Sequence, residues 1–161
     1  MAKEDFNIII MHGHTDEYKT LAGYIEEAGH TPRVLIDEYK ADTIFNHLRD
    51  IIWEEIHCAI VLLTADDEYK GVKQRARQNV VFELGYCFGA FDSLDEEGKY
   101  HAGHAIIVIA EKGVELFSDI DGLKRIEFEE GKIANRKEMI MEAINEAYKR
   151  AKKFYPKTCG W

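Results

Sequence analysis

Three uninterrupted runs of apolar, mostly β-branched residues constrain the fold of this chain more than any other feature of its sequence. They are FNIIIM at residues 6–11, CAIVLLT at residues 58–64 and AIIVIA at residues 105–110. A half-exposed strand alternates polar and apolar residues, whereas a continuously apolar strand is typical of a parallel sheet that is covered on both faces. These runs therefore predict a buried sheet with residues 58–64 as its central strand.

The segments between these runs carry apolar residues at helical spacing, which predicts the layers that cover the sheet. Helices are expected in the segments ending at Ala28 and Ile56 and over residues 79–91 and 135–155. Gly29 stands where a helix commonly ends in a left-handed residue. Shorter strands are predicted over residues 32–36 and 123–128, and a charged loop over residues 65–74.

This alternation predicts a single α/β domain over residues 1–161. Right-handed crossovers favour a flavodoxin-like, three-layer α/β/α fold whose five parallel strands have the order 2-1-3-4-5. In that order a crevice opens beyond the carboxyl ends of strands one and three. Residues 12–15 and 64–78 form the loops there, and they are the expected place for functional groups.

Charge and composition limit the classes of partner. Thirty acidic and 21 basic residues give a formal net charge of −9, which opposes binding to nucleic acid. No apolar run reaches the ~18 residues of a membrane span, and residues 1–5 do not resemble a signal peptide. We therefore expect a cytoplasmic protein with no membrane partner. The three cysteines, Cys58, Cys87 and Cys159, lack CxxC spacing and indicate buried thiols in a reducing compartment.

One ionisable residue, Glu83, lies in the otherwise apolar helix predicted over residues 79–91. The helix has no polar face, which predicts burial on all sides. Gly85 and Gly89 predict close packing against another element. A carboxylate in such surroundings is protonated, paired or functional, because burying it alone is costly. From this pattern alone, Glu83 either pairs with a nearby arginine or serves a reaction.

Four motifs occur in order along the chain. They are the apolar run that ends in His12-Gly13, VLLTADD at residues 61–67, RARQNVVFELG at residues 75–85 and LFSDIDG at residues 116–122. Together they resemble the signature of the bacterial TIR-like domain family, almost letter for letter over residues 75–85. These are predicted nucleotide-binding, NAD-cleaving domains that often accompany STING-like or cyclic-nucleotide sensors in antiphage defence. The chain departs from the family in having His14 in place of arginine, and Ala65 and Phe117 in place of prolines.

The resemblance implies cleavage of the N-glycosidic bond between nicotinamide and ribose in NAD, by a defence effector that is activated by self-association. One carboxylate is compatible with this chemistry, because the pyridinium leaves as neutral nicotinamide and needs no general acid, unlike the leaving oxygen in glycosidases. The remaining task is to stabilise positive charge on the ribose, electrostatically or covalently. We assign it to Glu83. NAD is then a substrate, and no cofactor or metal is expected; a separate sensor protein or domain is an expected partner.

Several residues are candidates for substrate binding. They are His12, Gly13, His14, Tyr39, Thr43, Asp66, Arg75, Arg77 and Asn79. Backbone N–H groups of residues 12–15 are suited to phosphate, although an ordinary turn has the same pattern. The two arginines either hold the pyrophosphate or pair with acids of their own loop. Asp66 contacts a ribose hydroxyl or stabilises its loop.

The remaining candidates also have two readings. Asn79 either caps the helix or orients Glu83. Tyr39 and Thr43 correspond to the family's mobile loop, which covers substrate. His101 and His104 lack the acid–histidine pattern of a metal site, so we interpret them as part of a surface loop.

Three functions remain open at this point. The first is an NAD glycohydrolase, and the second is a non-catalytic TIR-type module that assembles or binds a nucleotide. The third is an enzyme like the nucleoside deoxyribosyltransferases, which share the architecture and use a carboxylate nucleophile. The motif at residues 75–85 favours the first.

Overall fold

The apolar runs form the centre of a five-stranded parallel sheet. The computed structural model describes residues 6–35, 44–54, 56–91, 104–116 and 122–154. The strands of the sheet are β1 (Asn7–His12), β2 (Thr31–Val34), β3 (Cys58–Leu63), β6 (Ala105–Glu111) and β7 (Arg125–Phe128). Their spatial order is β2-β1-β3-β6-β7, and every neighbouring pair is parallel. The predicted order 2-1-3-4-5, with residues 58–64 at the centre, is confirmed.

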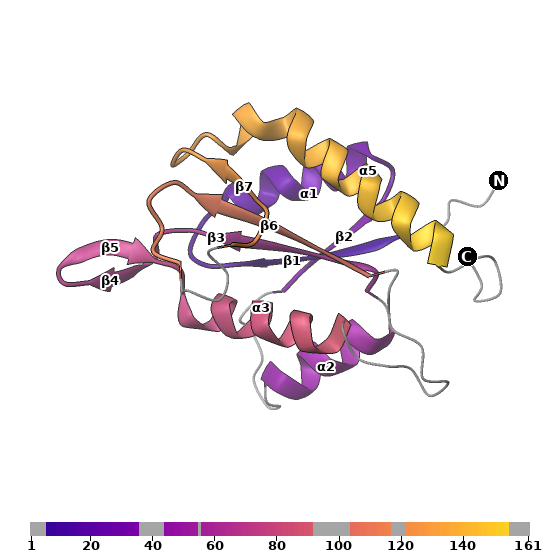
Figure 1. Ribbon diagram of the computed structural model, residues 1–161, viewed down its shortest axis with the longest axis horizontal. Helices are drawn as coiled ribbons and strands as arrows, with labels where there is room; N and C mark the ends of the chain where they lie inside the picture. The colour runs from indigo at the N-terminus through magenta and orange to yellow at the C-terminus, as the bar shows by residue number, and fades with distance from the viewer. Residues whose placement is uncertain (1–5, 36–43, 55, 92–103, 117–121, 155–161) are drawn as a thin grey trace.

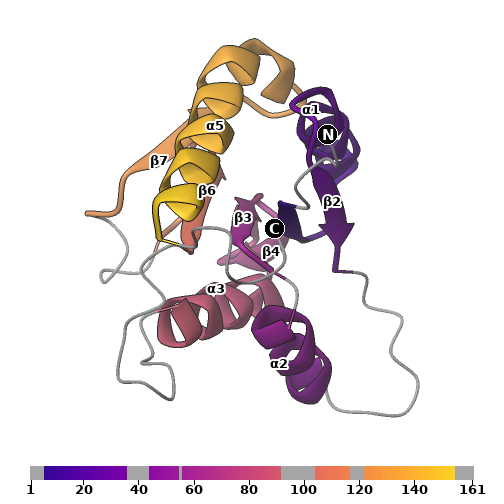
Figure 2. The ribbon, with the colours of Figure 1, turned by 90° about the vertical axis from the view of Figure 1, so that its right-hand side faces the viewer.

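Helices cover both faces of the sheet, as Figure 2 shows when the strands are seen nearly end-on. On one face lie α1 (Glu17–Glu27) and α5 (Lys137–Phe154), the latter preceded by the 3₁₀ helix η1 (Ile133–Arg136). On the other lie α2 (Ile44–Glu54) and α3 (Gln78–Phe91). This is the three-layer α/β/α arrangement that the sequence predicted.

Alternation along β1 explains how one strand serves two cores. Ile9 and Met11 pack with α2 and α3, whereas Ile8 and Ile10 pack with α1 and α5, and all four are fully buried or nearly so. Successive side chains of a strand point to opposite faces, so only a continuously apolar run fits this position.

The end of α1 follows the expected turn chemistry. Gly29 has a φ of +88°, in the left-handed region that glycine adopts without steric cost. The N–H of His30 donates to the carbonyl of Ile25 at 3.0 Å, which satisfies one of the last carbonyls of the helix. The turn leads directly into β2.

The segment predicted as a charged loop, residues 65–74, is wrong in part, because it contains a β-hairpin. Strands β4 (Asp67–Tyr69) and β5 (Val72–Arg75) pair antiparallel. Lys70 and Gly71 connect them with φ values of 52° and 82°, and positive φ at both central residues is what a type I′ turn requires. Figure 1 shows the hairpin projecting away from the main sheet.

Helix α3 is not buried on all sides, contrary to the prediction. Its inward face consists of Val80, Glu83, Leu84, Cys87 and Ala90. Phe82 is 51% exposed, and a β-carbon added at Gly85 or Gly89 would meet no described atom within 4 Å. The expected close packing at these glycines is therefore not found among the described residues. The reason is that the sheet covers only one side of the helix.

The described residues also test two further predictions. Cys58 and Cys87 are free and buried, as expected, and Cys159 lies outside the described ranges. Burial raises the pKa of both thiols. In the part of the chain that the structure describes, no helix is both long enough and apolar enough to cross a membrane.

Candidate functional site

Glu83 lies on the inward face of α3 and is only 4% exposed. The next residue on this face, one turn later, is Cys87, whose Sγ lies 3.6 Å from the Sδ of Met11 near the end of β1. Burial and the nearby Glu83 carboxylate raise the pKa of Cys87 to about 12. Glu83 is thus one turn before a residue that contacts β1, on a face of α3 that excludes most water. A carboxylate held there interacts more strongly with a developing charge than one in bulk solvent does.

Asn79 precedes Glu83 by one helical turn and lies on the same side of α3. Because the helix begins at Gln78, Asn79 is its second residue and does not occupy the capping position, which was one of its two expected roles. A side chain from the hairpin performs this task instead. The Oδ2 atom of Asp67 accepts a hydrogen bond from the N–H of Gln78 at 3.3 Å. An acidic group at the N-terminus of a helix is also favoured by the helix dipole.

Asp66 joins the loop after β1 to the loop after β3. Its Oδ2 atom accepts hydrogen bonds from the N–H of His14 and from the hydroxyl of Thr64, each at 3.0 Å. Gly13 is required beside it, because a β-carbon at Gly13 would lie 1.6 Å from that oxygen. Asp66 was expected either to contact a ribose hydroxyl or to stabilise its loop, and the hydrogen bonds described here are those of a loop-stabilising residue.

The two arginines of the motif lie in different places. Arg75 forms a two-point ion pair with Glu115, with Nε–Oε2 at 2.7 Å and Nη2–Oε1 at 3.0 Å, and its guanidinium lowers the pKa of that carboxyl. Both side chains line a cavity of 240 Å³ together with Val81. Val81 and Glu83 are about 200° apart around the helix axis, so Arg75 and Glu83 lie on opposite sides of α3.

Arg77, in contrast, is close to the loop after β1. Its β-carbon lies 3.6 Å from the position that a β-carbon of Gly13 would take. The structure therefore brings Arg77 together with Gly13, His14 and Asp66 at the edge of the sheet where strands β1 and β3 end. The side chain of Arg75 pairs instead with Glu115, although its backbone carbonyl accepts a hydrogen bond from the N–H of Asp66.

His12 is held on the α1 side of the sheet. Its ring stacks on Tyr18 with 4.0 Å between centroids. Its Nδ1 lies 2.7 Å from the carbonyl oxygen of Gly13, a contact in which Nδ1 must carry the hydrogen because a carbonyl only accepts. His12 therefore helps to shape the loop after β1.

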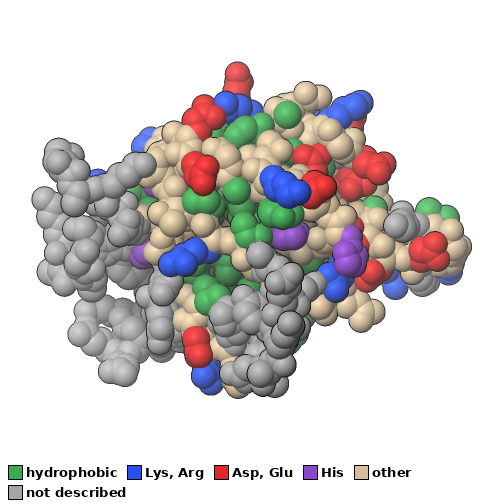
Figure 3. All heavy atoms as spheres, turned by 180° about the vertical axis from the view of Figure 1, so that it is seen from behind, with side chains coloured by type: hydrophobic (Ala, Val, Ile, Leu, Met, Phe, Trp, Pro, Cys, Tyr) green, Lys and Arg blue, Asp and Glu red, His purple; other side chains and the backbone are tan. Residues whose placement is uncertain are grey.

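A cavity of about 660 Å³ opens at the carboxyl ends of β1, β3, β6 and β7, beside the start of α1. It is bordered by the loops after β1 and β3, where the crevice was expected, and Glu83 is not among the residues that line it. Five carboxylates line it, together with His14 and Thr64: Asp16, Glu17, Asp66, Glu111 and Glu130. Partial burial raises the pKa of Glu111. Figure 3 shows acidic side chains close to the base of the hairpin. Such a lining repels phosphate groups.

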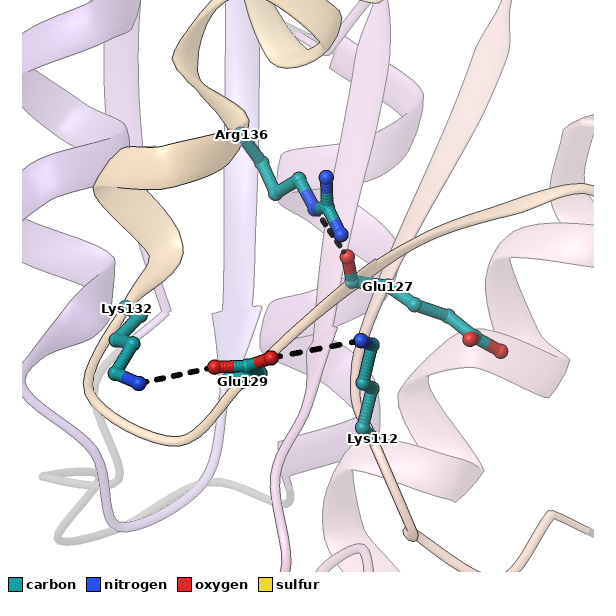
Figure 4. Close-up of polar contacts among 5 residues, drawn as sticks. All are labelled: Lys112, Glu127, Glu129, Lys132 and Arg136. Carbon is teal, nitrogen blue, oxygen red and sulfur yellow. Dashed lines mark hydrogen bonds and ion pairs between the residues drawn. The ribbon is translucent and has the colours of Figure 1, made fainter.

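The turn after β7, which forms one wall of this cavity, is fixed by the polar contacts drawn in Figure 4. Glu129 lies between Lys132 at 3.0 Å and Lys112 at 3.6 Å, and both cations lower the pKa of its carboxyl. The Nε–H of Arg136 donates to the backbone carbonyl of Glu127 at 2.7 Å. These contacts connect the ends of β6 and β7 to η1.

Of the four remaining residues singled out from the sequence, only one is described. Tyr39, Thr43 and His101 fall in segments that the structure does not describe. His104 is described, and its ring contacts Phe91 with 4.7 Å between centroids. The described ranges contain no group of three or more His, Cys, Asp or Glu residues placed to hold a metal ion.

Two polar residues of this region were missed. Asp67 stands in the VLLTADD motif, so its place directly before the helix motif was a usable signal. Glu115 had no such signal, because its contact with Arg75 joins segments 40 residues apart.

The parallel sheet, with a buried carboxylate on the helix that follows its central strand, defines a TIR-like domain. A family model described as "CAP12/Pycsar effector protein, TIR domain" matches residues 7–130. The chain belongs to this family of bacterial TIR-like antiphage effectors. The family and fold expected from the motifs are thus confirmed.

Known proteins with weaker similarity include an Escherichia coli (strain K12) protein named "Uncharacterized protein YuaY". It is 28% identical over an alignment of 130 residues that covers 76% of this chain and 40% of that relative, so the match spans less than half of the relative's length. Among solved structures, a sensor protein from Polaromonas sp. JS666 has a TM-score of 0.45 and 12% identity, covering 89% of this chain and 99% of that one. A fusion containing part of the yeast Spc42 trimeric coiled coil has a TM-score of 0.41 and 12% identity, covering 96% and 88%.

Proposed function

We propose that this defence effector is an NAD glycohydrolase and that Glu83 is its catalytic carboxylate. The single observation that carries the proposal is the burial of Glu83, 4% exposed, on the helix that carries the family motif. Open α/β folds bind ligands at the edge of the sheet where strands such as β1 end, and Cys87, one turn after Glu83, contacts Met11 near that end, which supports the assignment.

The chemistry requires only this one acid. As the bond between nicotinamide and ribose breaks, the electron pair goes to the pyridinium nitrogen, and nicotinamide leaves uncharged. The positive charge then develops at the anomeric carbon, where the Glu83 carboxylate stabilises it or bonds to it. Water completes the hydrolysis. Asn79, on the same side of α3 as Glu83, is suited to hold a ribose hydroxyl or to orient Glu83. Arg77, beside the loop after β1, is suited to approach the pyrophosphate.

We further propose that activity depends on self-association and on a cyclic-nucleotide sensor that responds to infection. The family description names Pycsar effectors, which supports a link to such a sensor. NAD is the proposed substrate and no additional cofactor is invoked.

The test is release of nicotinamide from NAD by the purified parent and by Glu83→Gln, each with and without forced clustering by a fused oligomerising helix. Glutamine keeps the shape of the side chain and removes its charge. We expect at least a 100-fold loss of rate in the clustered variant, with an unchanged circular dichroism spectrum. Glu142→Gln removes one exposed acid from α5, on the other face of the sheet, and is the matched control. Equal rates for the clustered parent and Glu83→Gln would contradict the assignment.

A second candidate is an assembly module without turnover, and the exposed side of α3 favours it. Phe82 is 51% exposed there, and no described atom lies within 4 Å of a β-carbon built at Gly85 or Gly89. This function is supported instead if the clustered parent releases no nicotinamide and if Phe82→Glu lowers the molar mass of the unfused protein in light scattering. Base exchange on deoxynucleosides, measured in the same preparations, tests the third function.

A further inference from the structure

Two adjacent carboxylates, those of Asp66 and Asp67, form hydrogen bonds to the loop after β1 and to the start of α3. The first, Asp66, bonds to the loop after β1 through the N–H of His14 and to its own loop through the hydroxyl of Thr64. Its backbone N–H donates to the carbonyls of Thr64 at 2.9 Å and of Arg75 at 3.0 Å, so the base of the hairpin is fixed as well.

The second carboxylate, Asp67, faces the helix. It accepts the N–H of Gln78, the first residue of α3, at 3.3 Å. This N–H has no partner within the helix, because the first four N–H groups of any α-helix lack one. The dipeptide thus contacts the loop after β1 with one side chain and the start of α3 with the next.

Helix geometry fixes the contact at Gln78 relative to Glu83. Glu83 is five residues after Gln78, about 7.5 Å along the axis of a helix. On the other side, Met11 lies two residues before Gly13 and contacts Cys87, the neighbour of Glu83 on the inward face. The two carboxylates therefore link the loop after β1, the loop after β3 and the start of α3.

We infer that Asp66 and Asp67 are positioning residues, which fix Glu83 against the end of β1 and do not contact the substrate. This inference rests on the proposed function. A mutation far from the reacting atoms lowers a rate by about 100-fold when it misplaces them by about 1 Å. In the positioning contacts the carboxylate oxygens of Asp66 and Asp67 only accept hydrogen bonds, and the side-chain oxygen of asparagine can accept the same bonds. A contact with a charged or hydroxyl group of the substrate would instead depend on the negative charge, which asparagine lacks.

The experiment compares alanine and asparagine at each position, in the full chain with forced clustering. We expect Asp66→Ala and Asp67→Ala to lower kcat for nicotinamide release by about ten-fold or more, with KM changed less than about three-fold. Asp66→Asn and Asp67→Asn are expected to recover most of that loss. Glu68→Gln removes an exposed charge from the same hairpin and is the matched control.

A second readout does not depend on catalysis. Hydrogen exchange of the His14 amide is expected to accelerate at least about ten-fold in Asp66→Ala, and that of Gln78 in Asp67→Ala, because each amide loses its acceptor. Circular dichroism establishes that each variant is folded.

The outcomes separate the two proposals. An Asp66→Asn variant as slow as Asp66→Ala, with a raised KM, means that the charge contacts substrate and overturns the positioning role. An unchanged kcat in both alanine variants also overturns it. If the clustered parent releases no nicotinamide, the proposed function fails, and exchange alone then decides: unchanged rates at both amides overturn the inference, and accelerated rates support it.

Discussion

Replacing Gly13 with alanine should destabilise the protein because of a single contact. The added β-carbon would lie 1.6 Å from Oδ2 and 2.8 Å from Cγ of Asp66, so the carboxylate has to leave its position. It then loses hydrogen bonds from the His14 N–H and the Thr64 hydroxyl. Bonds to a charged acceptor contribute about 1.5 kcal/mol each at the lower end of their range, which suits a partly exposed group such as Asp66. We expect Gly13→Ala to lower the free energy of unfolding by about 3 kcal/mol.

The backbone contributes little to this loss, since Gly13 does not have a positive φ. A double-mutant cycle isolates the contact. Asp66→Ala removes Oδ2 and Cγ, and the next atom, the β-carbon of Arg77, lies at an ordinary 3.6 Å. Adding Gly13→Ala to Asp66→Ala should therefore cost less than about 1 kcal/mol.

The assay is urea unfolding followed by circular dichroism. Gly23→Ala is the matched control, because Gly23 lies inside α1 with no described atom within 4 Å of an added β-carbon; alanine should stabilise that helix by up to about 1 kcal/mol. If the losses from Gly13→Ala and Asp66→Ala simply add, Asp66 is not the obstacle and the reasoning is refuted.

Three further results are expected. Arg75→Ala and Glu115→Ala should each change the free energy of unfolding by less than about 1 kcal/mol, because the pair is 44% and 42% exposed; a larger loss in urea unfolding would show that it does more than join two surface loops. The thiols of Cys58 and Cys87 stay protonated in the folded protein above their ordinary pKa of 9.0 but lose the proton in the unfolded chain, so the free energy of unfolding should fall between pH 9 and 11. Cys87→Ala should make this decline shallower, and equal slopes of stability against pH for parent and variant would contradict the reasoning. Burial raises the pKa of Glu111, which means that the charged form of this side chain destabilises the folded state. Glu111→Gln should therefore be more stable than the parent at pH 7, and this advantage should shrink as the pH approaches 4; a difference that stays constant with pH would contradict the reasoning.

The sheet was predictable from sequence because its strands are extreme in composition. A run such as CAIVLLT is compatible with few positions other than the centre of a covered sheet, and β3 occupies that position. Gly29 was equally informative, since only its left-handed conformation ends α1. The hairpin was missed because charged residues obscure its pattern, and its two strands are stabilised by a turn and by contacts at its base.

The candidate site was predictable only in part. The burial of Glu83 followed from its apolar neighbours and is confirmed. The separation of Arg75 from Glu83 did not follow, because Arg75 precedes α3 and its orientation is set by Glu115 on a different loop. The exposure of Phe82 also escaped prediction, since an apolar pattern does not reveal which side of a helix the sheet leaves uncovered.

The hairpin that projects from the edge of the domain offers a convenient attachment point for a reporter. Val72 is 57% exposed at its second strand, so a cysteine introduced there would react quickly, while the protonated, enclosed thiols of Cys58 and Cys87 would react slowly. With Cys159 changed to serine, a single dye at Val72→Cys would let energy transfer between differently labelled copies follow clustering in real time.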